Sequence, residues 1–477
     1  MERTAPPSAL DRARSKAYVR LLPLLFISYV IAYVDRANVA LAKLKMTEDL
    51  PGFDNAVIGF GAGVFFIGYF LLEIPGSLLV EKWSARKWIS RIMVTWGIMA
   101  ALTAFVKTPN QFYTVRFLLG LAEAGFFPGV IVYLTHWFTS RDRARALAWF
   151  FIATPIAQIV SPKLSYFLLR IGTQENIRGV VVDHPPLLGL QGWQWMYIAW
   201  GIPAVILGIL VFFYLTDRPA QAKWLAEDER EALEQELKRE RELHHAAGRH
   251  MGVLQALRHP KVLLLAMAYF FIVTGNYGVE FFLPSILERW YELRLDQLTW
   301  AVIIPPIGSL VGQIFIGWNS DRTGERRLHA TLPIFLGAGA LAGTLLIPPT
   351  LSMNQRLVIG VALFTLGVLG LKAYLPAFWS LPSLFLTEAA AAGSIGLINS
   401  VGNLGGFIGP FVLGFVESKT GSFVPGMIFL CVSMCISAVI ILSLGLGGSP
   451  RAVPAGREPL AQAAEAVADA DALIEPA

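Results

Sequence analysis

The sequence predicts an all-α membrane protein with twelve transmembrane helices in two pseudo-symmetric six-helix bundles. Three observations carry this prediction. The chain of 477 residues is 55 % hydrophobic and 15 % charged, which is too apolar for a soluble multidomain protein. Apolar stretches long enough to cross ~30 Å of hydrocarbon recur along the chain. A highly charged segment divides these stretches into two sets.

The expected spans follow the chain in order. The first set covers approximately residues 19–42, 57–80, 88–106, 111–138, 144–170 and 193–215, and the second approximately 260–287, 298–319, 330–348, 356–386, 391–416 and 424–446. The predicted domains are therefore a cytoplasmic N-terminal tail (1–18), the N-terminal bundle (19–215), a cytoplasmic linker (216–259), the C-terminal bundle (260–446) and a cytoplasmic C-terminal tail (447–477). The linker contains AEDEREALEQELKREREL, which predicts a charged, amphipathic cytoplasmic helix, and the composition of the last tail predicts disorder.

Basic residues predict the orientation of the chain. They cluster in the loops after the second, fourth and eighth spans, at Lys82, Arg86, Lys87, Arg141, Arg143, Arg145, Arg322, Arg326 and Arg327. Because cytoplasmic loops carry an excess of Lys and Arg, we expect these loops and both termini in the cytoplasm. The basic N-terminal segment precedes a full-length span, so we expect a tail of an inner-membrane, multi-pass protein and no cleaved signal peptide.

The two halves resemble each other in sequence. EKWSARKW follows the second span and GWNSDRTGERR closes the eighth, and Glu81 matches Asp321 as Arg86 matches Arg326, both at an offset of 240 residues. Two parallel six-helix halves are a known transporter architecture, with the substrate site near the bilayer midplane between the halves. We therefore expect a site at that place.

Charged residues occur inside the expected spans of the first half. Asp35 and Arg36 lie in the apolar stretch Leu21–Leu44, although a charge at membrane depth costs at least ~2.5–3.5 kcal/mol. Neighbouring helix positions point about 100° apart, so each residue needs a partner on another helix or a wet cavity. Arg116 and Glu123 are seven positions apart on one face, about 10.5 Å along a helix. An ion or substrate pathway and a structural ion-pair network both remain open.

The chemistry of these four residues fits coupled uptake of an anion. A guanidinium binds a carboxylate through two parallel hydrogen bonds and keeps its charge. A buried acid is suited to take up and release a proton. The sequence contains neither a GxxxxGK[ST] motif nor an HExxH or GxSxG motif, so a primary pump and an enzyme are both unsupported. We expect no cofactor, no metal site and no nucleic-acid partner.

Several motifs resemble those of a known family. The loop with Gly317, Asp321, Arg322, Gly324, Arg326 and Arg327 is similar to the cytoplasmic signature of the major facilitator superfamily, whereas its first-half copy has Ser84 and Ala85 where the family often has Gly. At a finer level the chain resembles the anion:cation symporter family, nearest to its tartrate, phthalate and organic-acid permeases. This resemblance rests on YVDRANVALA (33–42), FFIGYFLLEIPGSLL (65–79), RFLLGLAEAGFFPGVIVYLTHWF (116–138), TDRPAQAKWLAEDE (216–229) and INSVGNLGGFIGP (398–410).

The resemblance implies a monomeric secondary transporter of the inner membrane. It implies import of an organic carboxylate, expected to be a dicarboxylate such as phthalate or tartrate, by proton symport and alternating access. The proton sites would be Asp35 and Glu123, and the carboxylate partner Arg36 or Arg116. A structural Arg116–Glu123 pair, a sugar-acid or aromatic monocarboxylate symporter and an organic-anion exchanger are the alternatives.

Further residues are candidates for contacts with the substrate or for gating. Tyr33 and Tyr69 offer hydroxyl groups, with ordinary packing as the alternative. Asn399 and Asn403 offer amides, with hydrogen bonding between helices as the alternative. We expect Trp379 in a cavity wall, and a gate or charge network to involve Glu73, Asp321, Arg322 and Arg326.

Three charges depart from the family pattern. They are Lys163 in the fifth span, Glu280 in the seventh and Lys372 in the tenth. Lys372 is either a second carboxylate anchor, which would favour a dicarboxylate, or the partner of Glu280. Both interpretations remain open. Lys163 joins Glu280 as a candidate member of a charge network.

Overall fold

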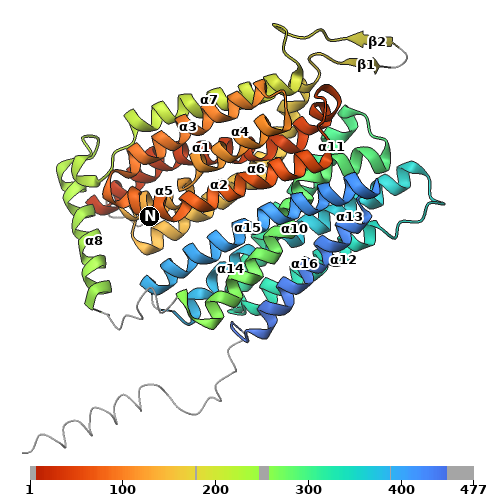
Figure 1. Ribbon diagram of the computed structural model, residues 1–477. Coiled ribbons are helices and arrows are strands. Elements are labelled where there is room, and N and C mark those ends of the chain that lie inside the picture. The colour runs from red at the N-terminus through yellow and green to blue at the C-terminus, as the bar shows by residue number, and fades with distance from the viewer. Residues whose placement is uncertain (1–6, 178–179, 247–256, 387, 448–477) are drawn as a thin grey trace, which may run out of the picture.

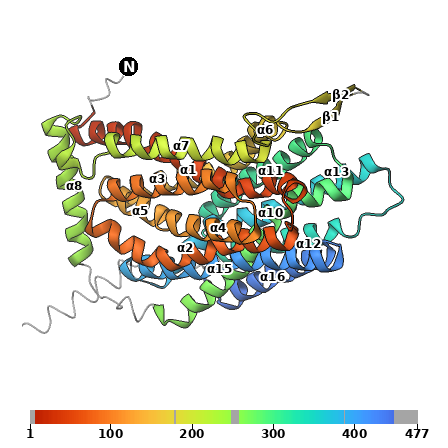
Figure 2. The ribbon, with the colours of Figure 1, turned by 45° about the horizontal axis from the view of Figure 1, so that its top comes forward.

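The computed structural model describes residues 7–177, 180–246, 257–386 and 388–447. The described chain is mostly helical, and its long helices form two bundles that lie side by side (Figure 1). In both ribbon views α7 and α16 lie on opposite outer sides of the molecule (Figure 2). The C-terminal tail, from residue 448 on, and its expected disorder lie outside the described residues.

The N-terminal bundle contains the helices up to residue 214. They are α1 (Ala9–Asp49), α2 (Asn55–Lys82), α3 (Ala85–Leu102), α4 (Pro109–Glu123), α5 (Phe126–Thr135), α6 (Ser140–Leu169) and α7 (Gly192–Tyr214), with the short turn η1 (Thr103–Phe105). Two antiparallel strands, β1 (Gln174–Ile177) and β2 (Val180–Asp183), form a hairpin before α7. We call the end of the molecule that carries these strands the hairpin end (Figure 1).

The C-terminal bundle follows the linker. The linker contains η2 (Pro219–Gln221) and α8 (Glu227–Ala246). The bundle contains α10 (Pro260–Tyr291), α11 (Leu295–Thr323), α12 (Arg327–Thr344), α13 (Met353–Ala373), α14 (Leu375–Ser380), η3 (Pro382–Leu384), α15 (Glu388–Thr420) and α16 (Val424–Ser443). The end of the molecule where α8 lies is called the α8 end below.

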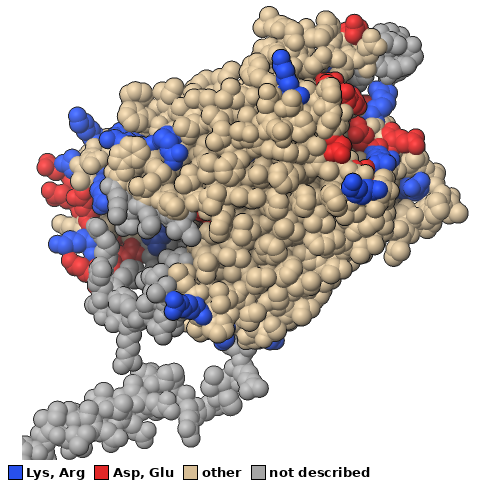
Figure 3. Space-filling view, in the orientation of Figure 1, with Lys and Arg blue, Asp and Glu red and all other residues tan. Residues whose placement is uncertain are grey.

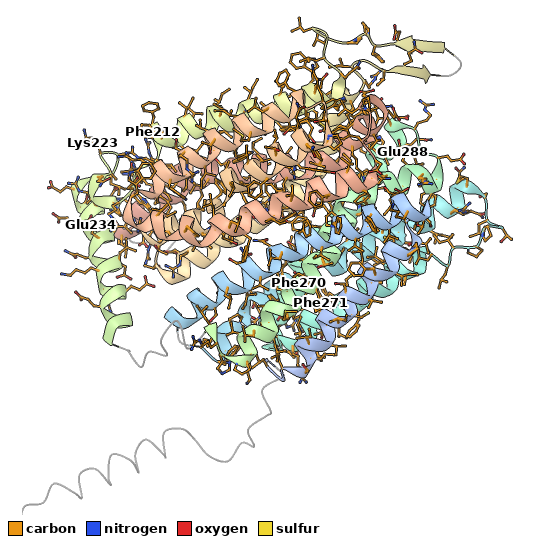
Figure 4. All side chains as sticks on the ribbon, in the orientation of Figure 1. Phe212, Lys223, Glu234, Phe270, Phe271 and Glu288 are labelled. Carbon is orange, nitrogen blue, oxygen red and sulfur yellow. The ribbon has the colours of Figure 1, made fainter. Side chains whose placement is uncertain are left out.

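The predicted fold class is confirmed. Ten helical segments of the described chain are long and apolar enough to cross a membrane, and α6 and α12 complete the two sets of six. Lys, Arg, Asp and Glu gather mainly at the two ends of the visible face, and the broad belt between them is almost free of charge (Figure 3). Glu234 lies at the α8 end and Glu288 at the opposite end (Figure 4). This distribution fits a molecule that spans a bilayer.

Two element boundaries differ from the expected ones. The fourth span, expected as one stretch at 111–138, is divided into α4 and α5 at Gly125, whose φ of +83° lies in the left-handed region. Glycine adopts this conformation without a steric penalty, so the helix breaks there. The first helix begins at Ala9, well before the expected start at residue 19, because the Ser8 side chain accepts a hydrogen bond from the Asp11 N–H and caps it.

The early turns of α1 dock onto the linker helix. Lys16 Nζ lies 2.7 Å from Glu229 Oε2, and Arg12 reaches both Asp228 and Glu229. Arg14 contacts Asp142, at the start of α6, at 3.1 Å. The hydrogen bond from Lys16 holds the pKa of Glu229 below its usual range. These contacts explain why residues expected in a tail are helical.

The two bundles meet along α2 and α15. At the hairpin end Asn55 donates to Glu417 at 2.6 Å, and the Ala56 N–H donates to Ser418 at 2.9 Å. A Cβ atom on Gly59 would lie 2.4 Å from the Pro410 carbonyl oxygen, so only glycine permits this approach. The bundles are therefore closed against each other at the hairpin end.

Candidate functional site

Arg36 is a charged residue of α1 that contacts both bundles. It forms an ion pair with Glu123 at the end of α4, and its guanidinium lies over the Phe65 and Tyr69 rings, 5.4 and 5.3 Å from their centroids. On its other side Nη1 donates to the Tyr277 hydroxyl of α10 at 3.4 Å. The side chain retains 14 % of its accessible surface. Arg36 therefore lies at the interface where a substrate is expected.

Asp35 and Arg116 lie deeper in the N-terminal bundle. They are 1 % and 0 % exposed, and Arg116 Nε donates to the Gly61 carbonyl at 3.4 Å. Asp35 lies in the electrostatic environment of Arg116 and Glu123, beside the Trp96 indole. Neither Asp35 oxygen and neither Arg116 Nη atom has a hydrogen-bond partner of normal geometry among the described residues. Glu123 thus pairs with Arg36, and the alternative Arg116–Glu123 hydrogen bond does not form.

A second polar cluster bridges the bundles through Tyr33. Its hydroxyl donates to Glu280 Oε2 at 3.0 Å and accepts from Lys372 Nζ at 3.0 Å. Lys372 Nζ also lies 3.3 Å from Glu280 Oε2, and Asn276 donates to the same oxygen at 3.4 Å. Of the two interpretations of Lys372, the structure shows the pairing with Glu280. Tyr33 is a member of this cluster.

Glu73 is the centre of a third cluster, between α2 and α15. It is 3 % exposed and accepts hydrogen bonds from Asn399 at 2.5 Å, Ser400 at 2.9 Å and Asn403 at 3.4 Å. Both asparagines therefore take the alternative arrangement, hydrogen bonding between helices. Because the donors and the acceptor belong to different bundles, Glu73 links the two halves.

The remaining sequence candidates surround these clusters or lie apart from them. Tyr69 supports Arg36, and half-buried Trp379 packs edge-on against Tyr269 with centroids 4.9 Å apart. Lys163 Nζ lies 4.7 Å from the centroid of Trp300, where α6 meets α11, and belongs to none of the three clusters. At the end of α11, Asp321 pairs at 2.5 Å with Arg326, which directly precedes α12, and Arg322 lies over the Trp318 ring.

Sequence reasoning missed several residues of the interface. Tyr277 and Ser400 carried no signal, because tyrosine and serine are common in helix packing. Lys43 is different: it is 1 % exposed, and its Nζ lies 3.4 Å from the centroid of Phe282 on α10. Its Nζ has no hydrogen-bond partner in the described part of the chain. A lysine inside an apolar stretch, eight positions after Asp35, was the signal that was available.

No metal site is found in the part of the chain that the structure describes. It contains no group of three or more His, Cys, Asp or Glu side chains placed to hold a metal ion. Cys431 and Cys435, the two cysteines of the sequence, are free thiols on α16. The side chains described at the interface offer carboxylates, guanidinium groups, the ammonium groups of Lys43 and Lys372, amides and hydroxyls.

Two six-helix bundles with charged side chains buried at their interface define a secondary transporter. The family model of the Major Facilitator Superfamily matches residues 25–410, and the chain belongs to this superfamily. A "Putative tartrate transporter" of Agrobacterium vitis is 40 % identical over 433 residues, which cover 91 % of this chain and 94 % of that protein. A quinolone resistance transporter of Acinetobacter baumannii is 38 % identical over 423 residues, covering 88 % and 92 %.

Solved structures agree with the fold. The inward-open xylose transporter XylE of Escherichia coli superimposes with a TM-score of 0.68 at 13 % identity, covering 91 % of this chain and 97 % of that one. The chain is thus a multi-pass membrane transporter and not an enzyme, and its resemblance to the organic-acid permease branch is confirmed by the relatives. The relatives' names differ in their substrates.

Proposed function

We propose that this protein imports an organic carboxylate across the inner membrane by proton symport and alternating access. The observation that carries the proposal is the Arg36–Glu123 ion pair at the bundle interface, with Asp35 and Arg116 buried in the same bundle. Relatives that are named as tartrate transporters support the substrate class. The proton is the coupling ion, and the working unit is a monomer.

The ion pair supplies a reason for coupling. A substrate carboxylate that binds Arg36 competes with Glu123 for the same guanidinium. When Glu123 loses its cationic partner in a buried place, its protonated form is favoured. Binding of the anion and loading of a proton therefore support each other, and Asp35 provides a second acid beside Arg116.

A second carboxylate would bind in the C-terminal bundle. Lys372 is the one cation of the Tyr33 cluster, and it is held by Glu280 in this conformation. A dicarboxylate such as phthalate or tartrate would replace Glu280 on Lys372 while its first carboxylate binds Arg36. Sugar acids and aromatic monocarboxylates would use Arg36 alone. These remain the alternatives, together with exchange of organic anions.

The orientation follows from the basic residues. The α8 end carries Arg12, Arg14 and Lys16 beside the linker. Arg86 lies in the first turn of α3, Arg322 in the last turn of α11, and Arg326 directly before α12. Because cytoplasmic loops carry an excess of Lys and Arg, we expect both termini inside. In this orientation the hairpin end, where the bundles are closed against each other, faces outward.

The experiment is transport by purified protein in proteoliposomes. A panel of tartrate, phthalate, sugar acids and aromatic monocarboxylates is tested for accumulation driven by a pH gradient and for counterflow without one. Asp35→Asn and Glu123→Gln should lose accumulation, while counterflow survives in at least one of them. Glu48→Gln, an exposed acid at the end of the same α1, is the matched control and should behave as the parent protein.

The outcomes separate the alternatives. Accumulation against a gradient in both mutants would remove Asp35 and Glu123 from the coupling mechanism. Uptake that requires an internal anion and ignores the pH gradient would identify an exchanger. A preference for a dicarboxylate over its monocarboxylate analogue that disappears in Lys372→Met would establish the second anchor. Equal loss of both ligands in that variant would make Lys372 a structural partner of Glu280.

A further inference from the structure

A cavity lies beside the Tyr33 cluster, where helices of both bundles meet. It is lined by residues of α1, α6, α10, α11 and α13, so it is part of the interface between the halves. The space open to the centre of a water molecule is about 60 Å³. A single bound water needs only ~10–15 Å³ by the same measure. The cavity therefore has room for a compact chemical group as well as for water.

The wall of this cavity is largely apolar. Its apolar lining comes from α1, α6, α10, α11 and α13, namely Ala37, Leu41, Pro162, Val279, Leu283, Pro306, Val368 and Leu371. Leu371 and Val279 are 2 % and 1 % exposed, so their side chains are fixed in the packed interior. A hydroxyl group placed against such a wall would lose its hydrogen bonds to water and gain none in return.

Polar groups occupy one part of the lining. They are Glu280 and Lys372, which form the ion pair, with Asn276 from the same helix as Glu280 and Gln158 and Ser161 from α6. Ser161 is 2 % exposed, and its Oγ has no hydrogen-bond partner among the residues that the structure describes. A mainly apolar pocket with a few polar groups is the usual form of a small-molecule site.

This combination distinguishes between substrates of equal charge. Tartrate and phthalate are both dicarboxylates, but tartrate presents hydroxyl groups between its carboxylates and phthalate presents a ring. Burying a ring against aliphatic side chains is favourable, because apolar surface leaves water. Burying hydroxyl groups there is unfavourable unless each forms a hydrogen bond. The uncharged side chains of the lining that can form one are Ser161, Asn276 and Gln158, all on its polar part.

We propose that this cavity is the subsite for the body of the substrate, and that the substrate is an aromatic carboxylate and not a polyhydroxylated one. The proposal rests on the proposed function for the anchoring of the carboxylate at Arg36. The ring lies between α1 and α13, and Lys372 and Ser161 face the substituents of the ring. Selectivity for the ring is then a property of the aliphatic wall, separate from recognition of charge.

The test compares phthalate with tartrate on three variants. In the parent protein, phthalate should compete for uptake at least tenfold better than tartrate. Ala37→Leu fills the cavity and should weaken phthalate by about tenfold or more while changing tartrate little. Val368→Thr keeps the shape and adds a hydroxyl to the wall, so it should weaken phthalate several-fold. Val358→Thr, on the same α13 but 69 % exposed, is the matched control and should change neither.

A second measurement separates this proposal from the proposed function. Thermal stabilisation of the detergent-purified protein by each acid reports binding without transport or proton coupling. Stabilisation by phthalate that is lost in Ala37→Leu supports the subsite even if no proton is coupled. Stronger stabilisation by tartrate than by phthalate, no stabilisation by phthalate, or equal loss of both ligands in Ala37→Leu would each overturn the proposal.

Discussion

Two arginines of the N-terminal bundle carry the same charge in different surroundings. Arg36 pairs with Glu123 and reaches Tyr277 across the interface, whereas Arg116 is completely buried against the Gly61 carbonyl and the Phe65 ring. Of the two, Arg36 is placed to meet a substrate. Arg116 is enclosed inside the bundle, in the electrostatic environment of Asp35.

Substitution by lysine should separate these roles. Arg36→Lys removes the planar fork that binds a carboxylate through two hydrogen bonds. Losing one charge-assisted hydrogen bond costs roughly 1.5–3 kcal/mol, so substrate affinity should fall about 10–100-fold. Arg116→Lys should lower thermal stability and leave the affinity of the folded fraction nearly unchanged. Binding isotherms and melting curves on both variants make the comparison. Unchanged affinity in well-folded Arg36→Lys would assign Arg36 a structural role.

The sequence predicted which charged residues lie inside the helices better than which residues contact one another. Asp35, Arg36, Arg116 and Glu123 were identifiable because a charge in an apolar stretch is costly. The Arg36–Glu123 pair was not, because it depends on how α1 and α4 are rotated against each other. The contacts of Glu73 with Asn399, Ser400 and Asn403 depend likewise on the packing of α2 against α15.

Among the elements, α8 shows how the linker is attached. Its first turn is acidic, and Glu229 is 2 % exposed beneath Lys16 and Arg12. Leu233 and Leu237, one and two turns further on, are also buried. The α8 helix is thus held by an ionic first turn and an apolar stripe.

The attachment of α8 should weaken in acid. Hydrogen bonding by Lys16 lowers the pKa of Glu229, so its ionised form stabilises the docked state. This contribution is present above the ordinary glutamate pKa of about 4.3 and is lost as the pH falls through the lower, docked value. Hydrogen exchange in α8 should therefore accelerate below about pH 4, because Glu229 becomes protonated as the pH falls below that ordinary pKa.

A substitution tests the same contact at neutral pH. Glu229→Gln should raise hydrogen exchange in α8, and Glu231→Gln, an exposed neighbour on the same helix, should not. Equal exchange in the two variants would show that the apolar stripe alone holds the helix.

The sequence predicted the elements well where a pattern spans many residues and poorly where one residue decides. Apolar stretches gave the spans, and the charged run gave the linker helix. The break at Gly125 was missed, because a glycine within an apolar stretch is equally compatible with a continuous helix. The hairpin β1–β2 was also missed, because its two strands are only four residues each.

For the whole molecule, closure of the hairpin end depends on close contact between α2 and α15. Gly59→Ala would place a Cβ atom 2.4 Å from the Pro410 carbonyl oxygen, so the helices would have to separate. We expect this variant to favour the state that is open at the hairpin end and to slow transport. Gly339→Ala, on α12 with no atom within 4 Å of the added Cβ, is the matched control.

Crosslinking reports the closed state directly. Ala56 and Ser418 are joined by a hydrogen bond of 2.9 Å, so the pair Ala56→Cys and Ser418→Cys should form a disulfide when the hairpin end is closed. The rate should fall when Gly59→Ala is added and stay unchanged with Gly339→Ala. Equal rates in both would mean that this contact tolerates a methyl group and does not control closure.

Proton symport is tested most directly by the movement of protons with the substrate. Proteoliposomes with a pH-sensitive dye inside receive an organic carboxylate outside, with no pH gradient at the start and protein-free vesicles as the control. We expect the interior to acidify as the parent protein transports the acid, and Asp35→Asn to abolish acidification while counterflow continues. Uptake by the parent protein without acidification, or unchanged acidification in both Asp35→Asn and Glu123→Gln, would contradict proton symport through this site.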